Sequence, residues 1–250
     1  MPELIKTPAL VLESIRWHES SKIVTLFTRR EGMLKAIARG ALRSKSAFSG
    51  RLETLNVIQC IISQKESREL QILTQAELID PQTMLKSDLH RLPYALSVVE
   101  LLKKVFEKGQ KDKIFFDFLL QIFQALHKSK QPEIVFWYFL LKLVSFLGFK
   151  PDFHRCFSCG QSAFLQGGWF VFKEGALLCS QCGSSVSLSP FLDDKTIYFL
   201  RRLQKYNHRK IHEFPWPVPK NTDLTSLILR YLSFHLGHGI VLESLKLLPA

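Results

Sequence analysis

The spacing of apolar residues changes once along this chain, near residue 80. Before that point, short runs rich in Val, Ile, Leu, Thr and Phe alternate with polar turns, a pattern typical of strands. After it, apolar residues recur at steps of three and four, the period of a helix that buries one side. The pattern predicts a β-rich domain over residues 1–80 and a helical domain over residues 81–250.

Five strands are predicted in the first domain, with no helical pattern between them. They lie at 8–17, 22–29, 33–39, 53–63 and 70–77. Five short consecutive strands suggest a small closed or partly open barrel, and the five-stranded OB barrel is a common nucleic-acid-binding fold of this size. We therefore predict an α+β multidomain protein that begins with an OB-fold barrel and continues as an all-α domain.

Five helices are predicted in the second domain, at 88–107, 113–127, 132–148, 193–206 and 221–236. The sequence GlyHisGly at 237–239 is a stop signal for the last of them. The most apolar stretch, 134–149, contains Lys142 and is shorter than the roughly 20 apolar residues of a membrane span. We expect a buried helix there and no membrane association.

Positive charge is concentrated in the predicted barrel. The chain has 34 Lys and Arg against 22 Asp and Glu, which favours polyanionic partners. Between residues 16 and 45, eight basic residues accompany two acidic ones. Simple solvation of exposed faces explains any single lysine or arginine, but this local excess favours nucleic acid. Two smaller basic clusters lie at 103–113 and 201–210.

The segment ARGALRSKSAFSGRLE, residues 38–53, is predicted to be a basic loop between the third and fourth strands. Its basic side chains can reach phosphates, and Phe48 offers a ring on which a base could stack. Lys35 and Arg39 are four apart on a strand and share a face. The alternative is a flexible hairpin loop that only contributes solubility. The candidate nucleic-acid-binding residues are Arg29, Arg30, Lys35, Arg39, Arg43, Lys45, Phe48 and Arg51.

Two Cys-x-x-Cys pairs, nineteen residues apart, lie in CFSCGQSAFLQGGWFVFKEGALLCSQCG. The N-terminus lacks the features of a secretory signal, so we expect a cytoplasmic protein with reduced thiols. Metal ligation is then favoured over disulfides, and a redox pair would need a βαβ context that the pattern lacks. Four sulfur ligands leave no open position on a metal, so we predict a structural Zn²⁺ ribbon at about 151–188. Its ligands are Cys156, Cys159, Cys179 and Cys182.

Enzymatic function is not expected. The sequence contains none of the G-x-x-x-x-G-K-[ST], G-x-G-x-x-G, G-x-S-x-G or H-E-x-x-H motifs. A zinc hydrolase would need a site with three protein ligands and a bound water, in which case a chelator would abolish turnover. We therefore assign no catalytic residues.

The chain resembles the RecO family of bacterial recombination mediators over essentially its whole length. The likeness rests on the N-terminal strand pattern, the basic loop at 38–53, LQILTQAELID at 70–80, and a four-cysteine ribbon that interrupts a helical C-terminal region. The order of these three parts is also that of the family.

This resemblance implies an OB-fold DNA-binding domain followed by a helical domain with a zinc ribbon. Such proteins bind single- and double-stranded DNA, anneal strands coated by single-strand-binding protein, and help load RecA together with RecR, without covalent chemistry. A cytoplasmic, nucleoid-associated location is implied.

The resemblance also implies that the helical domain of this chain binds the acidic tail of the single-strand-binding protein, which ends in phenylalanine. The first candidates for that contact are Lys103, Lys104 and Lys108, and the second are Arg201 and Arg202. The alternative function is that of an RNA- or ribosome-associated OB-fold scaffold with a structural ribbon, which would prefer structured RNA over DNA.

Overall fold

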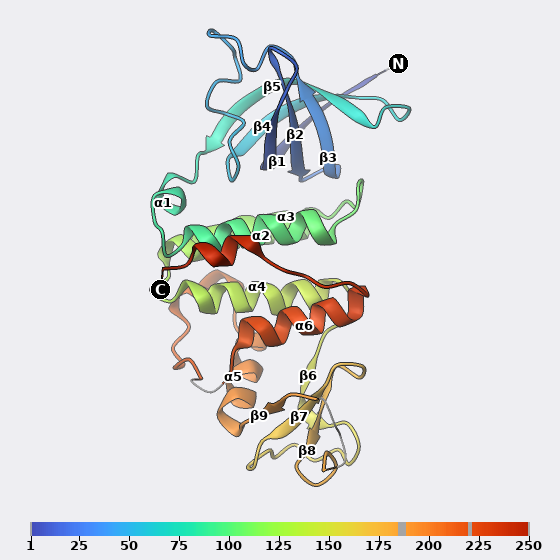
Figure 1. Cartoon of the computed structure of the whole chain (residues 1–250), viewed down its shortest axis with the longest axis vertical. Helices are drawn as coiled ribbons and strands as arrows, with labels where there is room; N and C mark the ends of the chain where they lie inside the picture. Colours follow the sequence, from blue (N-terminus) through green and yellow to red (C-terminus); the bar gives the residue numbers. More distant parts are fainter. Residues whose placement is uncertain (1, 185–188, 220–221, 250) are drawn as a thin grey trace. The chain divides into compact units, whose positions relative to one another are not determined.

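The computed structural model describes residues 2–184, 189–219 and 222–249 of the chain. The chain forms two compact units (Figure 1), one comprising Met1–His127 with Leu242–Ala250 and the other Lys128–Val241. The first unit therefore combines the strand-rich region with the first helices. The predicted domain boundary at residue 80 follows the change from strands to helices and stays a prediction.

The first five strands close into a barrel in the order β1-β2-β3-β5-β4, which confirms the predicted OB-like fold. β1 pairs with both β2 and β4, helped by a bulge between Val11 and Glu13, and β3 pairs in parallel with β5. The strands are β1 (Glu3–Trp17), β2 (Ser21–Thr28), β3 (Gly32–Ala38), β4 (Val57–Gln64) and β5 (Leu70–Asp80).

Two predicted strand starts differ from the structure by more than one residue. β1 begins five residues before the predicted residue 8, because residues 3–10 pair with β4. β4 begins at Val57, and the predicted start at residue 53 is wrong. Residues 53–56 form a turn in which the Asn56 NH donates to the Glu53 carbonyl at 3.0 Å. The apolar residues continue from the loop into the strand, so the sequence does not show at which residue the hydrogen bonds to the neighbouring strand begin.

Aromatic residues join the barrel to its helices within the first unit. The ring of Phe27 contacts Phe106 at a centroid distance of 5.2 Å and Phe116 at 6.3 Å. At Gly32, φ is +64° and an added Cβ would lie 2.0 Å from the Gln110 carbonyl oxygen, so glycine is required there. The helices are α1 (Thr83–Lys86), α2 (Leu92–Val105) and α3 (Lys113–Lys128).

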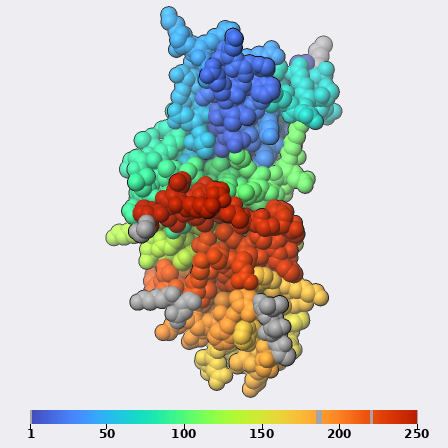
Figure 2. All heavy atoms as spheres, in the orientation of Figure 1, coloured from blue at the N-terminus to red at the C-terminus, as the bar shows by residue number. Residues whose placement is uncertain are grey.

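The C-terminal segment returns to the first unit as a short 3₁₀-helix, η2 (Glu243–Leu247), that packs on α2. The Glu100 carboxylate on α2 accepts hydrogen bonds from the backbone NH groups of Glu243 and Ser244, each at 3.2 Å. Figure 2 shows this segment in dark red at the surface, beside the green part of the chain. The sequence pattern does not predict this short helix.

The second unit is built on α4 (Pro132–Phe146), which is buried along almost its whole length. This confirms the predicted buried helix. Around it lie α5 (Asp194–Lys205), the 3₁₀-helix η1 (His208–Glu213) and α6 (Leu224–Leu236). Lys142 reaches the Gln204 carbonyl at 2.9 Å, which satisfies its ammonium group among apolar neighbours. Among the described residues, no helix is both long and apolar enough to cross a membrane.

The two C-terminal helices carry the expected end signals. Asp193 caps α5 by accepting from the Thr196 NH at 2.7 Å, and Asp223 caps α6. Gly237 ends α6 in the left-handed conformation with φ 74°, as the GlyHisGly sequence predicts. Residue 221, the predicted start of this helix, lies outside the described residues.

A four-stranded sheet in the order β6-β8-β7-β9 interrupts the helices of the second unit. Phe170 of β7 packs against Phe153 of β6 and Tyr231 of α6, at centroid distances of 5.3 and 5.1 Å, which attaches the sheet to the helices. The predicted end of the ribbon, 185–188, lies outside the described residues. The strands are β6 (Asp152–Cys156), β7 (Gly168–Val171), β8 (Ala176–Cys179) and β9 (Phe191–Leu192).

Candidate nucleic-acid interface and metal centre

The basic loop after β3 is a succession of turns rather than an open hairpin. The Arg43 NH donates to the Gly40 carbonyl at 3.1 Å, and the Ser46 NH donates to the Arg43 carbonyl at 3.0 Å. Arg39, Arg43 and Lys45 are exposed and line a groove of about 420 Å³ on the barrel surface. Among the described residues, none of these three side chains makes an ion pair, so their charges face solvent.

Phe48 lies differently from the sequence-based expectation. Its side chain is only 9% exposed and belongs to the buried barrel cluster that includes Leu26, Ala36 and Leu52. The ring is part of the barrel core, because removing its apolar surface from water stabilises the fold. The expectation that Phe48 presents a ring for base stacking is therefore corrected.

The other predicted DNA-binding residues fall into two groups. Lys35 and Arg30 are exposed, and alternation along β3 places Lys35 on the same outer face as Arg39. Arg51 instead donates to the Ala76 carbonyl of β5 at 2.7 Å. Arg29 makes a bidentate pair with Asp117 on α3, with both bonds at 2.8 Å. Sequence spacing does not distinguish these structural arginines from the solvent-facing ones.

The Arg29 pair also affects protonation. The hydrogen bonds and charge of the guanidinium hold the pKa of the Asp117 carboxyl below its ordinary value, despite some burial. The same carboxylate raises the pKa of Arg29. Both side chains are about half exposed, so this pair contributes little to stability. Its clearest effect is to fix the orientation of Arg29 toward α3.

The lysines at the end of α2 and just after it contact neighbouring groups in the first unit. Lys103 pairs with Glu13 of β1 at 2.5 Å, and Lys104 pairs with Glu100 at 3.7 Å. Lys108 donates to the Glu69 carbonyl at 3.2 Å. The Glu13 and Glu100 carboxylates thus partly neutralise the cluster that the sequence suggests as a first binding surface for an acidic tail.

Arg201 and Arg202 of α5 lie in the second unit beside a cavity of about 740 Å³. Arg201 lines it, and donates to the carbonyls of Phe153 and Ser162 at 2.6 and 3.0 Å. Arg202 lies over the rings of Tyr198 and Trp216, at 5.0 and 5.4 Å. Single residues in the sequence do not reveal this cavity, because its walls come from three separate segments.

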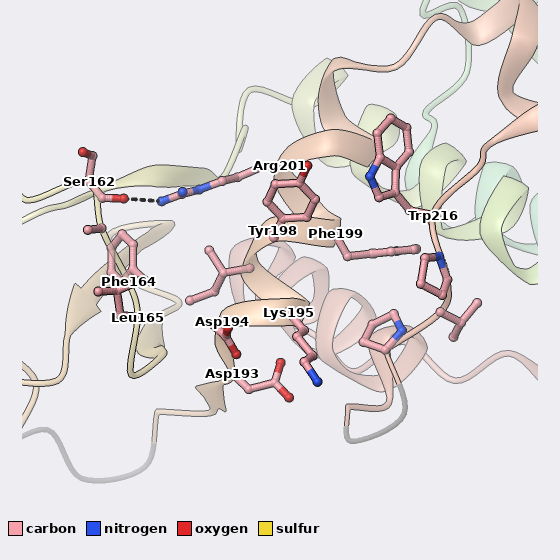
Figure 3. A pocket seen from close by; sticks show the side chains of 15 residues that line it. Ser162, Phe164, Leu165, Asp193, Asp194, Lys195, Tyr198, Phe199, Arg201 and Trp216 are labelled. Atoms are coloured by element: carbon pink, nitrogen blue, oxygen red, sulfur yellow. Dashed lines mark hydrogen bonds between the residues drawn. The ribbon is translucent and has the colours of Figure 1, made fainter.

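Figure 3 shows how the walls are arranged. Phe164 and Leu165 come from the ribbon, Tyr198 comes from α5, and Trp216 comes from the Pro-rich segment before α6. Leu165 is 88% exposed and Tyr198 is 45% exposed, so apolar surface is open to solvent at the rim. The charged residues of the lining are Asp193, Asp194, Lys195 and Arg201.

The four predicted cysteine ligands converge on one point. Cys156 ends β6 and Cys179 ends β8, and each is followed by a turn that the NH of Gly160 or Gly183 closes at 2.8 Å. All four sulfur atoms lie within 4.8 Å of one another, and the Cys159 and Cys179 sulfurs are 3.9 Å apart. Tetrahedral ligation with metal–sulfur bonds of about 2.3 Å requires sulfurs about 3.8 Å apart. The cluster therefore fits a single metal ion.

Local hydrogen bonds favour the thiolate form of Cys156. Burial raises the pKa of this thiol, but the backbone NH groups of Cys159, Cys179 and Ser158 outweigh burial and lower the pKa to about 6. In the same cluster the pKa of Cys182 rises to about 12, chiefly through its hydrogen bond with Cys179. A cation bound among the four sulfurs would favour the thiolate form of each, because metal ligation requires deprotonated cysteine. Cys60 is separate, buried in the barrel, where burial raises its pKa to about 12.

Two family models match most of the chain. The model of the family "Recombination protein O N terminal" matches residues 1–82, and that of "Recombination protein O C terminal" matches residues 86–242. A DNA repair protein RecO from Caldanaerobacter subterraneus is 30% identical over 233 residues, 93% of each chain. The DNA repair protein RecO from Alkaliphilus metalliredigens is 29% identical over 93% of this chain and 94% of its own.

A third relative, the DNA repair protein RecO from Bacillus pumilus, is 31% identical over 72% of this chain and 69% of its own length. The two family models meet between residues 82 and 86, where the barrel gives way to the helices. The two family models together match nearly the whole chain, and a relative at 30% identity is covered over 93% of its length, so the chain belongs to the RecO family.

Proposed function

We propose that this protein is a DNA-binding recombination mediator without covalent chemistry. It anneals complementary single strands coated by single-strand-binding protein and, with RecR, assists RecA loading in gap repair. The observation that carries the proposal is the exposed basic surface of Lys35, Arg39, Arg43 and Lys45 on the barrel, whose side chains make no ion pair with any other residue that the structure describes. Membership of the RecO family supports it.

Annealing follows from charge. Two complementary strands repel each other, and a cationic surface that neutralises phosphates on both of them lowers this repulsion while releasing counterions. The chain has a formal net charge of +12 and several clusters of basic residues that can contact phosphates. The predicted cytoplasmic, nucleoid-associated location accords with such a role and stays a prediction.

The test is the annealing rate of two complementary oligonucleotides coated with single-strand-binding protein, whose acidic tail is intact or deleted. We expect acceleration that depends on the tail, and its loss in Arg39→Glu/Arg43→Glu. The matched control is Lys6→Glu/Lys173→Glu, which removes the same charge at exposed positions outside the loop. No acceleration, together with preferential binding of structured RNA, would favour the RNA-scaffold alternative instead.

We further propose that the four cysteines hold a structural Zn²⁺. Sulfur ligation with four protein ligands favours zinc and leaves no position for a substrate or water. Cys156, Cys159, Cys179 and Cys182 would bind the ion and thereby join the ends of β6 and β8. Elemental analysis of the purified chain should find about one zinc per chain, and Cys179→Ser should lose it. Retention of a different metal would refute the assignment.

The tail of the single-strand-binding protein is proposed to bind beside α5, the second of the two surfaces suggested by the sequence. The cavity there offers apolar walls for a terminal phenylalanine, with Lys195 and Arg202 nearby for carboxylates. A fluorescent tail peptide should bind more weakly to Arg202→Glu than to Lys103→Glu/Lys104→Glu/Lys108→Glu. The reverse order would move the site to α2.

A further inference from the structure

An exposed tryptophan lies on the outer face of the barrel, at the edge of the basic loop. Trp17 is the last residue of β1, and 42% of its surface is exposed. It shares the outer face with Ile15, which is 48% exposed, because side chains two apart on a strand point the same way. Tryptophan usually buries its large apolar surface, so an indole that is exposed to water at the end of a strand is unusual.

The strand register places Trp17 in line with the basic loop. Trp17 lies opposite Ser21 of β2, and Lys22 lies opposite Ala38 of β3. Continuing this register by one residue puts Ser21 beside Arg39, so Trp17, Ser21 and Arg39 form one row across the face. Neighbouring strands lie about 4.8 Å apart, so the backbones of Trp17 and Arg39 are about 10 Å from each other across the sheet.

Two contacts hold this region together. The Leu42 NH donates to the Ser20 carbonyl at 2.9 Å, which ties the basic loop to the β1–β2 turn. His18, with φ 52°, packs against Trp17 at a centroid distance of 4.8 Å and an interplanar angle of 74°. Of the nearby acidic residues, Glu13 is paired with Lys103, and Glu19 is exposed in the turn. The indole is thus held next to a surface on which basic groups predominate.

We propose that Trp17 is the residue on which an unpaired base of single-stranded DNA stacks, while Arg39, Arg43 and Lys45 contact the adjoining phosphates. This inference rests on the proposed DNA-binding function and adds a strand preference to it. OB folds bind oligonucleotides along the β2–β3 face and the β1–β2 loop, the region where Trp17 lies. Because Phe48 is buried, the loop itself offers no exposed ring.

The chemistry favours a single strand over a duplex. An aromatic side chain stacks on any base whose face is free, whereas the bases of a duplex are already stacked on each other. Phosphate contacts from the loop are available to both forms of DNA and carry the salt dependence. Trp17 should therefore add affinity for single strands alone.

The experiment compares Trp17→Ala and Trp17→Phe with the wild-type chain, using a fluorescent oligonucleotide and its blunt duplex over a series of salt concentrations. Trp17→Ala should weaken single-strand binding roughly five- to 100-fold, and Trp17→Phe should retain most of it. Duplex binding and the salt slope should stay unchanged, because no phosphate contact is removed. Leu4→Ala, which removes another exposed apolar side chain from β1, serves as the matched control.

Each outcome separates this inference from the proposed function. If the wild-type chain binds DNA and Trp17→Ala binds single strands equally well, or loses single strand and duplex alike, the stacking assignment fails alone. If the wild-type chain binds neither form, the DNA-binding function fails with it. Circular dichroism and urea unfolding check that the variant is folded, and ultraviolet crosslinking should recover the peptide that contains Trp17 attached to the oligonucleotide.

Discussion

At the scale of single residues, burial separates structural from solvent-facing members of the basic loop. Phe48 is packed into the barrel, so Phe48→Ala should cost about 3 kcal/mol of the free energy of unfolding, the low end for a buried aromatic residue. Urea unfolding measures this loss, and single-strand affinity under folding conditions should change little. A stable Phe48→Ala protein with greatly weakened DNA binding would show that the ring contacts DNA after all.

The arginines of the loop allow a matched comparison. Arg39→Gln/Arg43→Gln should lower the salt slope of single-strand binding by about 1.4, since each phosphate contact contributes about 0.7. Arg51→Gln should leave the slope unchanged, because Arg51 hydrogen-bonds the Ala76 carbonyl, and should instead cost about 1 kcal/mol of stability. Binding titrations at several salt concentrations measure both. A slope reduced equally by Arg51→Gln would place that side chain on a phosphate.

At the scale of elements, Glu100 fastens η2 to α2. Burial opposes ionisation of this carboxyl, but hydrogen bonds from the Ser244 and Glu243 NH groups and the Ser244 hydroxyl outweigh burial, and the pKa is lowered from 4.5. Because the folded-state pKa is depressed, its contribution to stability is present above pH 4.5 and is lost as the pH falls through the folded value.

Glu100→Gln should therefore cost about 1 to 2 kcal/mol at neutral pH. The difference from wild type should shrink as the solution is acidified below the ordinary glutamate pKa. Urea unfolding at neutral and acidic pH gives the two free energies, and hydrogen exchange at 243–247 reports release of the segment. An equal difference at both pH values would mean that the charge of Glu100 is not what holds η2.

At the scale of the whole molecule, the four candidate metal ligands all come from the second unit, whereas the barrel belongs to the first. Chelation of the proposed Zn²⁺ should therefore expose the backbone of β6 to β8 and lower the stability of the second unit, because the free energy of binding a structural metal adds to the free energy of folding. Hydrogen exchange should rise over 152–179 and remain low in β1 to β5. Equal loss of protection in the barrel would contradict this confinement.

Much of the architecture could be predicted from local pattern. The alternation of strands and the helical period after residue 83 follow from which side of each element is buried, and short-range periodicity records this directly. The small sheet of the second unit was predicted only as a ribbon, since strands such as β7, with four residues, are too short to show a period. Likewise η2 depends on a distant partner, Glu100, and not on its own sequence.

The sequence by itself determined the barrel, the helical region and the choice of the four cysteines as candidate metal ligands. The first two depend on local periodicity, and the third depends on the spacing of the cysteines. Only the tertiary structure decided that Phe48 is buried while Trp17 is exposed. It also decided that Arg29 and Arg51 have side-chain partners, whereas Arg39 and Arg43 make no ion pair within the described parts of the chain. The physical reason is that burial and pairing depend on groups distant in the chain, such as Asp117 for Arg29, whose proximity no local pattern encodes.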